Sequence, residues 1–217
     1  MINTVLYDMD GLLLDTEPLW VICMWQIAQK HKIPIQKHQF KETTGLRIVE
    51  VTHYWSLKYP WDGASYEQVA DEIVDAIIEE SKQKAKVLPG IIDSLELFKS
   101  KGFKIGLASS SPQKMINDLV DYFDIKSYFN TITSADEVSC GKPHPAVFLR
   151  CAELLESQPF QCLVFEDSIN GIIAAKAARM KVIAIPELHV AKNPKFSIAD
   201  GQLNSMTDLN WSMIENI

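Results

Sequence analysis

Cysteine and histidine are scarce in this 217-residue chain: it has four cysteines, none in a CxxC pair, and five histidines without HxxxH or HExxH spacing. A chain of this length can bury a sizeable core without disulfide bonds. Free thiols and a reducing, cytoplasmic location are therefore expected. The histidine spacing leaves a zinc site without ligands.

Long apolar runs and an excess of positive charge are also missing. No uninterrupted apolar segment approaches the roughly 18–20 residues that a membrane helix needs, and the first basic residue is Lys30, which does not suit a secretion signal. The net charge of -7 and the pI near 5.2 disfavour nucleic acid and anionic membranes as partners. An anionic substrate would need local cations, such as a bound divalent metal.

Short apolar or β-branched runs alternate with helical patterns, which predicts βαβ units and an α/β fold with a mostly parallel sheet covered by helices. The predicted strands are Val5–Tyr7, Phe103–Ala108, Thr131–Thr133, Cys162–Phe165 and Val182–Ile185. The predicted helices between the later strands are Ile91–Lys99, Pro112–Tyr122, Pro145–Leu155 and Ile169–Met180. The stretch "ADGQLNSMTDL" predicts a last short strand and helix.

One connection is far longer than the others, because residues 8–102 separate the first strand from the second. Residues from about 16 to 87 have a helical pattern, with Glu17–Ile33 and Tyr66–Lys86 the clearest pieces. We therefore predict a core of residues 1–15 and 88–217 and an inserted helical cap domain of residues 16–87. The predicted hinges lie at Asp15-Thr16 and Val87-Leu88.

Chemically useful side chains follow the predicted strands where each one ends. They are Asp8 and Asp10 after the first strand, Ser109 after the second, Lys142 beyond the third, and Glu166 and Asp167 at the end of the fourth. Because ligands bind at the carboxyl ends of parallel strands, these side chains are expected to converge on one rim. Carboxylates, a hydroxyl and an ammonium together suit phosphoryl transfer.

Two of the acids divide the predicted chemistry. Asp8 can attack phosphorus and form an aspartyl phosphate, while Asp10 can protonate the leaving oxygen and later deprotonate water. Clustered carboxylates repel one another unless a cation sits among them, and Mg²⁺ prefers oxygen ligands. We assign to it Asp8, the main-chain carbonyl of Asp10, and Asp167, with Glu166 as a further or water-mediated ligand.

The remaining catalytic positions would bind the phosphoryl oxygens. Lys142 would neutralise phosphate and nucleophile, and Ser109 with nearby backbone N–H groups would hold the equatorial oxygens. Ser110 is a candidate for substrate binding. Each feature also has a structural interpretation: Asp10-Gly11 as a turn, Ser111 as an N-cap before Pro112, Lys142 as a solvated loop residue, and Glu166-Asp167-Ser168 as a helix entry. Their joint occurrence at successive strand ends favours the catalytic interpretation.

With these residues in hand, the chain resembles the haloacid dehalogenase superfamily of aspartate-nucleophile phosphatases. Its motifs appear as "DMDG", the first Ser of "ASSS", the Lys of "GKPHP" and the acidic pair of "FEDSING". The resemblance implies a Rossmann-like three-layer core with a helical cap inserted after the first motif, and a Mg²⁺ cofactor. Asp10 excludes the founding dehalogenase activity, because those enzymes lack an acid at this position.

Within the superfamily, "DTEPLW", "TTGLRI" and "YPWDG" resemble bacterial sugar-phosphate phosphatases of the hexitol phosphatase and 2-deoxyglucose-6-phosphate phosphatase type. The resemblance implies a small sugar or sugar-alcohol phosphate as substrate. Three cap residues are candidates for substrate binding: Arg47, Trp20 and Gly45. A surface arginine and a packing tryptophan are equally good interpretations of the first two.

Two alternatives stay open. β-Phosphoglucomutase shares all four motifs, but it carries a histidine at the position of Trp20, and we favour hydrolysis. A non-catalytic binding module is a different class of protein, and the presence of all four motif residues argues against it. A cap that covers its own site requires no partner chain, so a monomer is expected.

Overall fold

Six parallel strands form one sheet in the computed structural model, which describes residues 1–43 and 46–217. The strands are β1 (Thr4–Tyr7), β2 (Lys104–Ser109), β3 (Thr131–Ser134), β4 (Cys162–Glu166), β5 (Lys181–Ala184) and β6 (Gly201–Gln202). Each neighbouring pair is parallel. The predicted α/β fold with a mostly parallel sheet is confirmed, and β6 lies in the C-terminal stretch where a last strand is expected.

The order across the sheet is β3-β2-β1-β4-β5-β6, so the chain starts in the middle, winds to one edge and then returns to the other side of β1. The direction of winding switches between β1 and β4, where open α/β sheets leave a crevice at the carboxyl ends of the strands. Tyr7 is paired with Phe165 across these two strands. Asp8 and Glu166 therefore follow side by side at the switch point.

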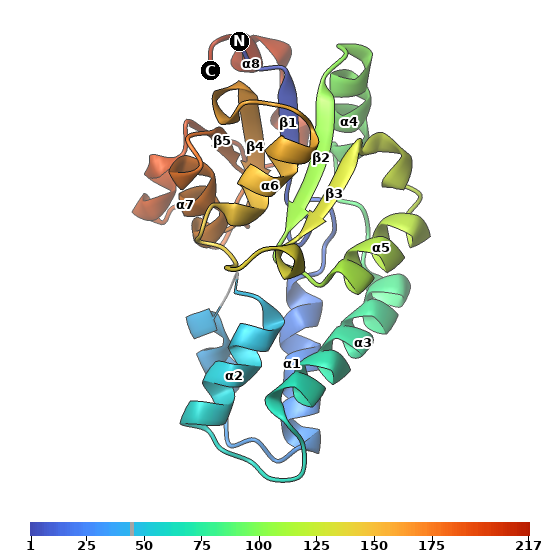
Figure 1. Ribbon diagram of the computed structural model, residues 1–217, viewed down its shortest axis with the longest axis vertical. Helices are drawn as coiled ribbons and strands as arrows, with labels where there is room; N and C mark the ends of the chain where they lie inside the picture. Colours follow the sequence, from blue (N-terminus) through green and yellow to red (C-terminus); the bar gives the residue numbers. More distant parts are fainter. Residues whose placement is uncertain (44–45) are drawn as a thin grey trace.

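Helices cover both faces of the sheet (Figure 1). Successive residues of a strand point to opposite faces, so they belong to two different hydrophobic clusters. Val5 and Tyr7 belong to one buried cluster and Leu6 to the other. Among the helices that flank the sheet, α4 (Ile91–Ser100), α5 (Gln113–Tyr122) and α8 (Trp211–Glu215) contribute to the first cluster, and α6 (Ala146–Leu154) and α7 (Ile169–Ala177) to the second. The first cluster also continues into the helices inserted between β1 and α4. The predicted three-layer core is confirmed.

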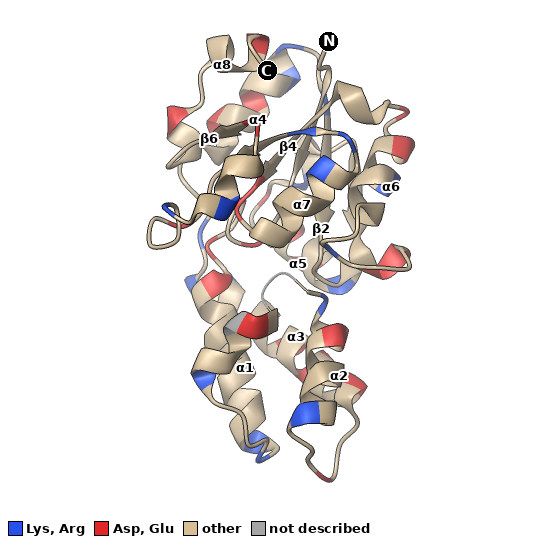
Figure 2. Ribbon diagram, turned by 90° about the vertical axis from the view of Figure 1, so that its left-hand side faces the viewer, with Lys and Arg blue, Asp and Glu red and all other residues tan. Residues whose placement is uncertain are grey.

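Between β1 and α4 the chain forms a separate group of helices beyond the carboxyl edge of the sheet, which Figures 1 and 2 show from two sides. The group comprises α1 (Glu17–Lys30), the 3-10 helix η1 (Lys37–Thr43), α2 (Ile48–Lys58) and α3 (Tyr66–Lys84). The first helix ends before the predicted Ile33, because Lys32 has a left-handed backbone (φ 54°) and Pro34 follows. Lys, Arg, Asp and Glu are interspersed along the ribbon in both parts of the molecule (Figure 2).

Helix α3 shows why the inserted segment folds as helices. Ser65 accepts a hydrogen bond from the Gln68 N–H at 3.2 Å, and the Gln68 side chain accepts one from the Ser65 N–H at 2.9 Å, which closes a capping box. Its buried residues recur at helical spacing: Val69, Ala70, Ile73, Val74, Ile77, Ile78 and Ser81. This apolar stripe packs against α1 and α2.

Two neighbouring segments join the helical group to the sheet. The Asp15 N–H donates to the Lys86 carbonyl at 3.0 Å, and the Leu88 N–H donates to the Leu13 carbonyl at 2.9 Å. The two predicted hinge segments therefore run side by side. That residues 16–87 form a domain of their own stays a prediction. In the described part of the chain, no helix combines the length and apolarity needed to cross a membrane.

Candidate active site

The site begins directly after β1. The Asp8 N–H donates to the Phe165 carbonyl at 3.2 Å, which extends the pairing with β4 beyond Tyr7. The chain then turns at Gly11, whose φ is +73°, and a Cβ at this position would collide with the Asp167 carboxylate. Glycine is therefore required here both for the backbone conformation and for the close approach of Asp167.

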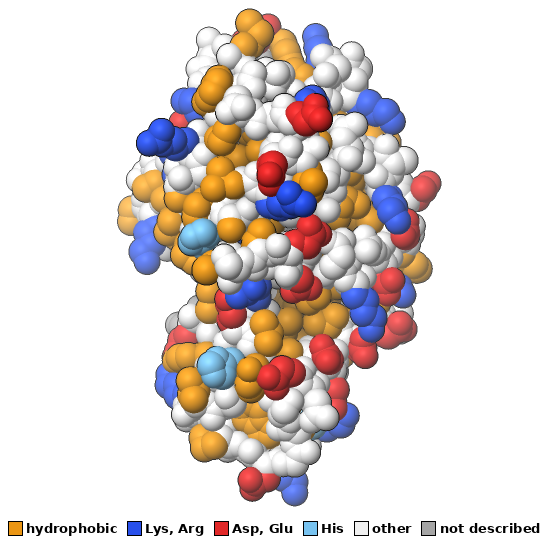
Figure 3. Space-filling model, viewed as in Figure 1, with side chains coloured by type: hydrophobic (Ala, Val, Ile, Leu, Met, Phe, Trp, Pro, Cys, Tyr) orange, Lys and Arg blue, Asp and Glu red, His pale blue; other side chains and the backbone are white. Residues whose placement is uncertain are grey.

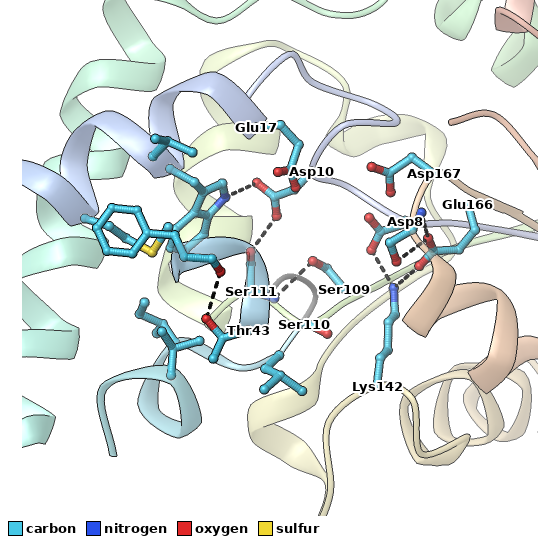
Figure 4. Close-up of a pocket in the computed structure, with 18 of the residues that line it drawn as sticks. Asp8, Asp10, Glu17, Thr43, Ser109, Ser110, Ser111, Lys142, Glu166 and Asp167 are labelled. Atoms are coloured by element: carbon cyan, nitrogen blue, oxygen red, sulfur yellow. Dashed lines mark hydrogen bonds and ion pairs between the residues drawn. The ribbon is translucent and has the colours of Figure 1, made fainter. Parts of the chain in front are cut away.

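Lys142 lies between two of the acids (Figure 4). Its Nζ is 2.6 Å from Asp8 Oδ1 and 2.6 Å from Glu166 Oε1, and only 2% of its side chain is exposed. Burial lowers the pKa of Lys142, but the Asp8 and Glu166 carboxylates outweigh burial and raise it above the ordinary value. The side chain that reaches the site from the loop between β3 and α6 is therefore a fixed positive charge.

Three carboxylates gather around this point. One oxygen each from Asp8, Glu166 and Asp167 can be chosen so that all three lie within 4.8 Å of one another. Burial, and to a lesser extent the charges of Glu166 and Asp10, raise the pKa of Asp8 to about 7 against the opposing effect of Lys142. Burial, followed by the charges of Glu166 and Asp8, also raises the pKa of Asp167 well above its ordinary value.

This donor set fits a hard divalent cation. All three candidate ligands are oxygens, and Lys142 is paired with only two of the three acids, so their ionised forms favour a further positive charge. Asp8 and Asp167 are the best candidates to hold it. Glu166 is already engaged, because its Oε1 faces Lys142 and its Oε2 accepts hydrogen bonds from the Ser168 N–H at 2.8 Å and hydroxyl at 2.9 Å.

Asp10 points to a different set of partners (Figure 4). Its Oδ1 accepts hydrogen bonds from the Thr16 hydroxyl at 2.7 Å and the Trp20 indole N–H at 3.0 Å, and its Oδ2 accepts one from the Ser111 hydroxyl at 2.5 Å. Thr16 and Trp20 lie at the start of the helical group, whereas Ser111 follows β2. Asp10 is thus held between the two parts of the molecule, and its role as acid and base stays a prediction.

Three serines follow one another at the end of β2, and Ser111 does not cap the next helix as one structural interpretation expects. Helix α5 begins at Gln113 with Pro112 at its N-cap, so the interpretation of Ser111 as the N-cap is wrong. The Ser111 hydroxyl binds Asp10 instead, and its N–H donates to Ser109 Oγ at 3.1 Å. Ser109 and Ser110 both line the cavity that Asp8 also lines, and their roles in phosphate binding stay predictions.

A cavity of about 260 Å³ separates the strand ends from the helical group. The wall on the side of the sheet carries Asp8, Asp10, Ser109, Ser110, Lys142 and Asp167. The opposite wall is mostly apolar and includes Trp20, Val21, Met24, Phe40, Leu46, Ile48 and Val51. The cavity can therefore place the charged end of a small molecule on the carboxylate–lysine centre and the rest of it against the helices.

The three predicted cap residues have different positions. Trp20 lines the cavity, as predicted. Arg47 is not among the residues that line this cavity, and its guanidinium contacts Glu50 and main-chain carbonyls instead. Gly45 lies outside the described residues. The substrate-binding roles of all three stay predictions.

Glu17 is a cavity residue that the sequence analysis missed. It occupies the first turn of α1, and its carboxyl group lies close to Asp10 in the cavity (Figure 4). Burial, together with Asp10, Glu187 and the other acids, raises its pKa to about 8. An acid at the start of a helix normally indicates a favourable interaction with the helix dipole, so the pattern alone did not reveal a fifth acid at the site.

Glu17→Gln should stabilise the metal-free protein in a pH-dependent way. A carboxyl group whose pKa is raised from 4.5 to about 8 by folding weakens the folded state progressively as pH rises through this interval. We expect the variant to unfold at the same denaturant concentration as wild type near pH 4. At pH 8 it should gain ~2 kcal/mol, allowing for partial exposure. A stability difference that does not change between these pH values would contradict this account.

The fold and the site together define a doubly wound α/β enzyme with an aspartate–lysine–carboxylate centre at its switch point. The chain belongs to the haloacid dehalogenase-like hydrolases, because the model of that family matches residues 5–185. The resemblance drawn from the four motifs is therefore confirmed, and so is the expectation of an enzyme.

Curated relatives match almost the whole chain. Hexitol phosphatase B of Escherichia coli K12 is 37% identical over 209 residues, covering 96% of this chain and 94% of the relative. The phosphorylated carbohydrates phosphatase of Thermotoga maritima is 32% identical over 185 residues, covering 83% of each.

Solved structures share the fold at lower identity. CbbY of Rhodobacter sphaeroides in complex with phosphate has a TM-score of 0.87 at 23% identity and covers 97% of both chains. A β-phosphoglucomutase of Clostridium difficile has a TM-score of 0.85 at 24% identity, covering 100% of this chain and 96% of that one. These likenesses concern the fold alone.

Proposed function

We propose that the chain is a magnesium-dependent phosphatase that hydrolyses phosphomonoesters of small sugars or sugar alcohols through a phosphorylated Asp8. The observation that carries the proposal is the Asp8 carboxylate, held 2.6 Å from Lys142 within a cluster of acids at the β1–β4 switch point. The names of the hexitol and carbohydrate phosphatases, at 37% and 32% identity, support the substrate class.

The reaction has two steps, phosphorylation of Asp8 and hydrolysis of the phosphorylated Asp8. In the first, an Asp8 oxygen bonds to phosphorus, the bond to the ester oxygen breaks, and Asp10 gives its proton to the departing oxygen. In the second, water attacks the same phosphorus, Asp10 takes up the proton, and the bond to Asp8 breaks to release inorganic phosphate. Asp10 ends each cycle protonated, as it began.

The other residues hold the phosphoryl group in place. Lys142 balances negative charge on Asp8 and on the phosphoryl oxygens, while Ser109 and Ser110 supply hydrogen-bonding groups at the end of β2. Magnesium, held by Asp8, the Asp10 main-chain carbonyl and Asp167, would neutralise phosphoryl charge when bound. Trp20 fixes the Asp10 carboxylate through its indole N–H.

Residues 16–87 act in this proposal as a cap that excludes water while the ester is cleaved. Two neighbouring chain segments, hydrogen-bonded to each other, connect residues 16–87 to the sheet, and the helices of this segment supply one wall of the cavity. One chain provides both walls, which supports an active monomer acting on a small phosphorylated molecule. A cytoplasmic location agrees with the four free cysteines.

A panel of phosphorylated metabolites, assayed for phosphate release with magnesium, tests the proposal. Hexitol phosphates and 2-deoxyglucose 6-phosphate should release phosphate faster than nucleotides or phosphorylated three-carbon acids. Glucose 1-phosphate distinguishes the mutase alternative. Its conversion to glucose 6-phosphate with negligible release of phosphate would overturn hydrolysis.

Asp10→Asn should slow hydrolysis of sugar phosphates by roughly 10²–10⁴-fold, the usual contribution of a positioned acid or base. p-Nitrophenyl phosphate has a leaving group that needs no proton, so the first step should survive with this substrate. We therefore expect a rapid burst of one equivalent of nitrophenolate followed by slow turnover. Normal steady-state rates with both substrates would show that another group moves the proton.

A further inference from the structure

Arg47 stands at the start of α2, where Glu50 fixes its direction. Its Nε donates to Glu50 Oε1 at 2.9 Å and its Nη2 to the same oxygen at 2.5 Å, while the Arg47 N–H donates to Glu50 Oε2 at 3.2 Å. About a fifth of the arginine side chain is exposed, at 19%. The guanidinium is thus a partly buried, pre-oriented group.

From this position Arg47 crosses to the core and reaches the loop between β3 and α6. Its Nη1 lies 3.4 Å from the Ala135 carbonyl oxygen and 3.3 Å from that of Val138, and its Nη2 lies 3.5 Å from that of Ser139. Each hydrogen bond is long, but all three acceptors belong to one loop. Figure 1 shows the start of α2 directly beneath this loop.

The aliphatic part of the Arg47 side chain packs against the same loop at Gly141, two residues after Ser139. A Cβ added to Gly141 would lie 2.9 Å from Arg47 Cγ and 3.3 Å from Glu50 Oε2. Gly141 therefore leaves room for the arginine to lie against the main chain. The next residue is Lys142, whose Nζ lies between Asp8 and Glu166.

We propose that Arg47 is a positioning residue, which holds residues 135–141 in place when α2 is docked on the core and thereby sets Lys142 against Asp8. This inference rests on the proposed function, in which Lys142 acts on the phosphoryl group. It gives Arg47 a role through the protein rather than through the substrate. Docking of the helical group and completion of the catalytic centre are then one event.

Lys114 provides a matched control, because it also joins the two parts of the molecule. Its Nζ lies 2.5 Å from Asp75 Oδ1, so the pair links α5 to α3, and both side chains are 64% exposed. Among the described residues, Lys114 forms no hydrogen bond or ion pair with residues 135–141, and an exposed pair contributes little to stability. The face that carries this junction is hollowed (Figure 3), with Lys114 and Asp75 in the lining of the hollow.

Steady-state kinetics distinguish positioning from substrate binding. Arg47→Ala should lower kcat on the order of 10- to 100-fold, because small displacements of catalytic groups are costly, and leave KM nearly unchanged. Arg47→Lys should not restore kcat, since a lysine ammonium lacks the planar set of N–H donors with which the guanidinium reaches several carbonyls. Lys114→Ala should change both constants less than about twofold. A raised KM with normal kcat, or rescue by lysine, would overturn the inference in favour of a substrate ligand.

Gly141→Ala probes the same contact from the core side. The added methyl group should lower kcat in the presence of Arg47, whose stem it displaces, and should have little further effect in the Arg47→Ala background. Such non-additivity is expected only for residues in contact. Additive losses would mean that Arg47 does not act through this loop.

Hydrogen exchange gives a readout that does not require activity. In Arg47→Ala, amides of residues 135–142 should exchange faster than in wild type and in Lys114→Ala, with the strands unchanged. If wild type hydrolyses no phosphoester while this exchange pattern appears, the proposed function fails and the contact stands. If wild type is active and exchange in the loop is unchanged, the role assigned to Arg47 is wrong.

Discussion

Asp8→Asn should reduce phosphate release from sugar phosphates by on the order of 10⁴-fold or more, because removal of a covalent nucleophile costs about this much. The amide cannot bond to phosphorus, although it matches the carboxylate in size. Folding should persist, since burial already raises the pKa of Asp8 to about 7 and a neutral group suits this environment. The loss would therefore be chemical rather than structural.

Asp121→Asn is the matched control for this substitution. It makes the same change in an exposed carboxylate of α5, whose side chain is 58% accessible and pairs with Lys126. We expect its phosphate release and melting temperature to equal those of wild type. Substantial turnover by Asp8→Asn would eliminate the covalent mechanism, and unfolding of that variant at neutral pH would contradict the electrostatic account of the site.

Chelation of divalent metal should stop turnover completely, and magnesium should restore it. One carboxylate oxygen each of Asp8, Glu166 and Asp167 lies within 4.8 Å of the other two, and the Lys142 ammonium lies between Asp8 and Glu166. Without a further cation, a phosphate dianion would approach several negative charges. Unchanged activity in excess chelator would contradict the proposed metal site.

Metal binding should also be visible without substrate. Magnesium at 100 times its dissociation constant would stabilise the folded protein by about 2.7 kcal/mol, provided that the unfolded chain does not bind it. The melting temperature of wild type and of Asp121→Asn should rise accordingly, whereas Asp167→Asn should show little change. An equal rise in all three proteins would place the bound cation elsewhere.

The strand ends of the site were predictable because two simple patterns coincide. Short apolar runs identify buried strands, and parallel strands present their carboxyl ends at one edge. Asp8, Ser109 and Glu166 therefore fall together once the strands are recognised, and their motifs identify the family. Lys142 was harder to place from the pattern alone, because it follows β3 only after a loop of irregular structure.

The contacts between the helical group and the core could not be read from the sequence. Glu17 and Arg47 are ordinary residues for the start of a helix, and only tertiary packing brings one beside Asp10 and directs the other to the loop before Lys142. Ser111 likewise satisfies the rule for an N-cap, but its hydroxyl binds Asp10. Such choices depend on partners that are distant in the chain.

The most direct test of the mechanism is to trap the phosphorylated protein. Asp10→Asn protein with magnesium and p-nitrophenyl phosphate should be quenched in acid after the burst, digested and analysed by mass spectrometry. We expect one added phosphoryl group on the peptide that contains Asp8, located at Asp8 by fragmentation and lost at alkaline pH. Product formation with no phosphoryl group on Asp8 at any time would contradict it.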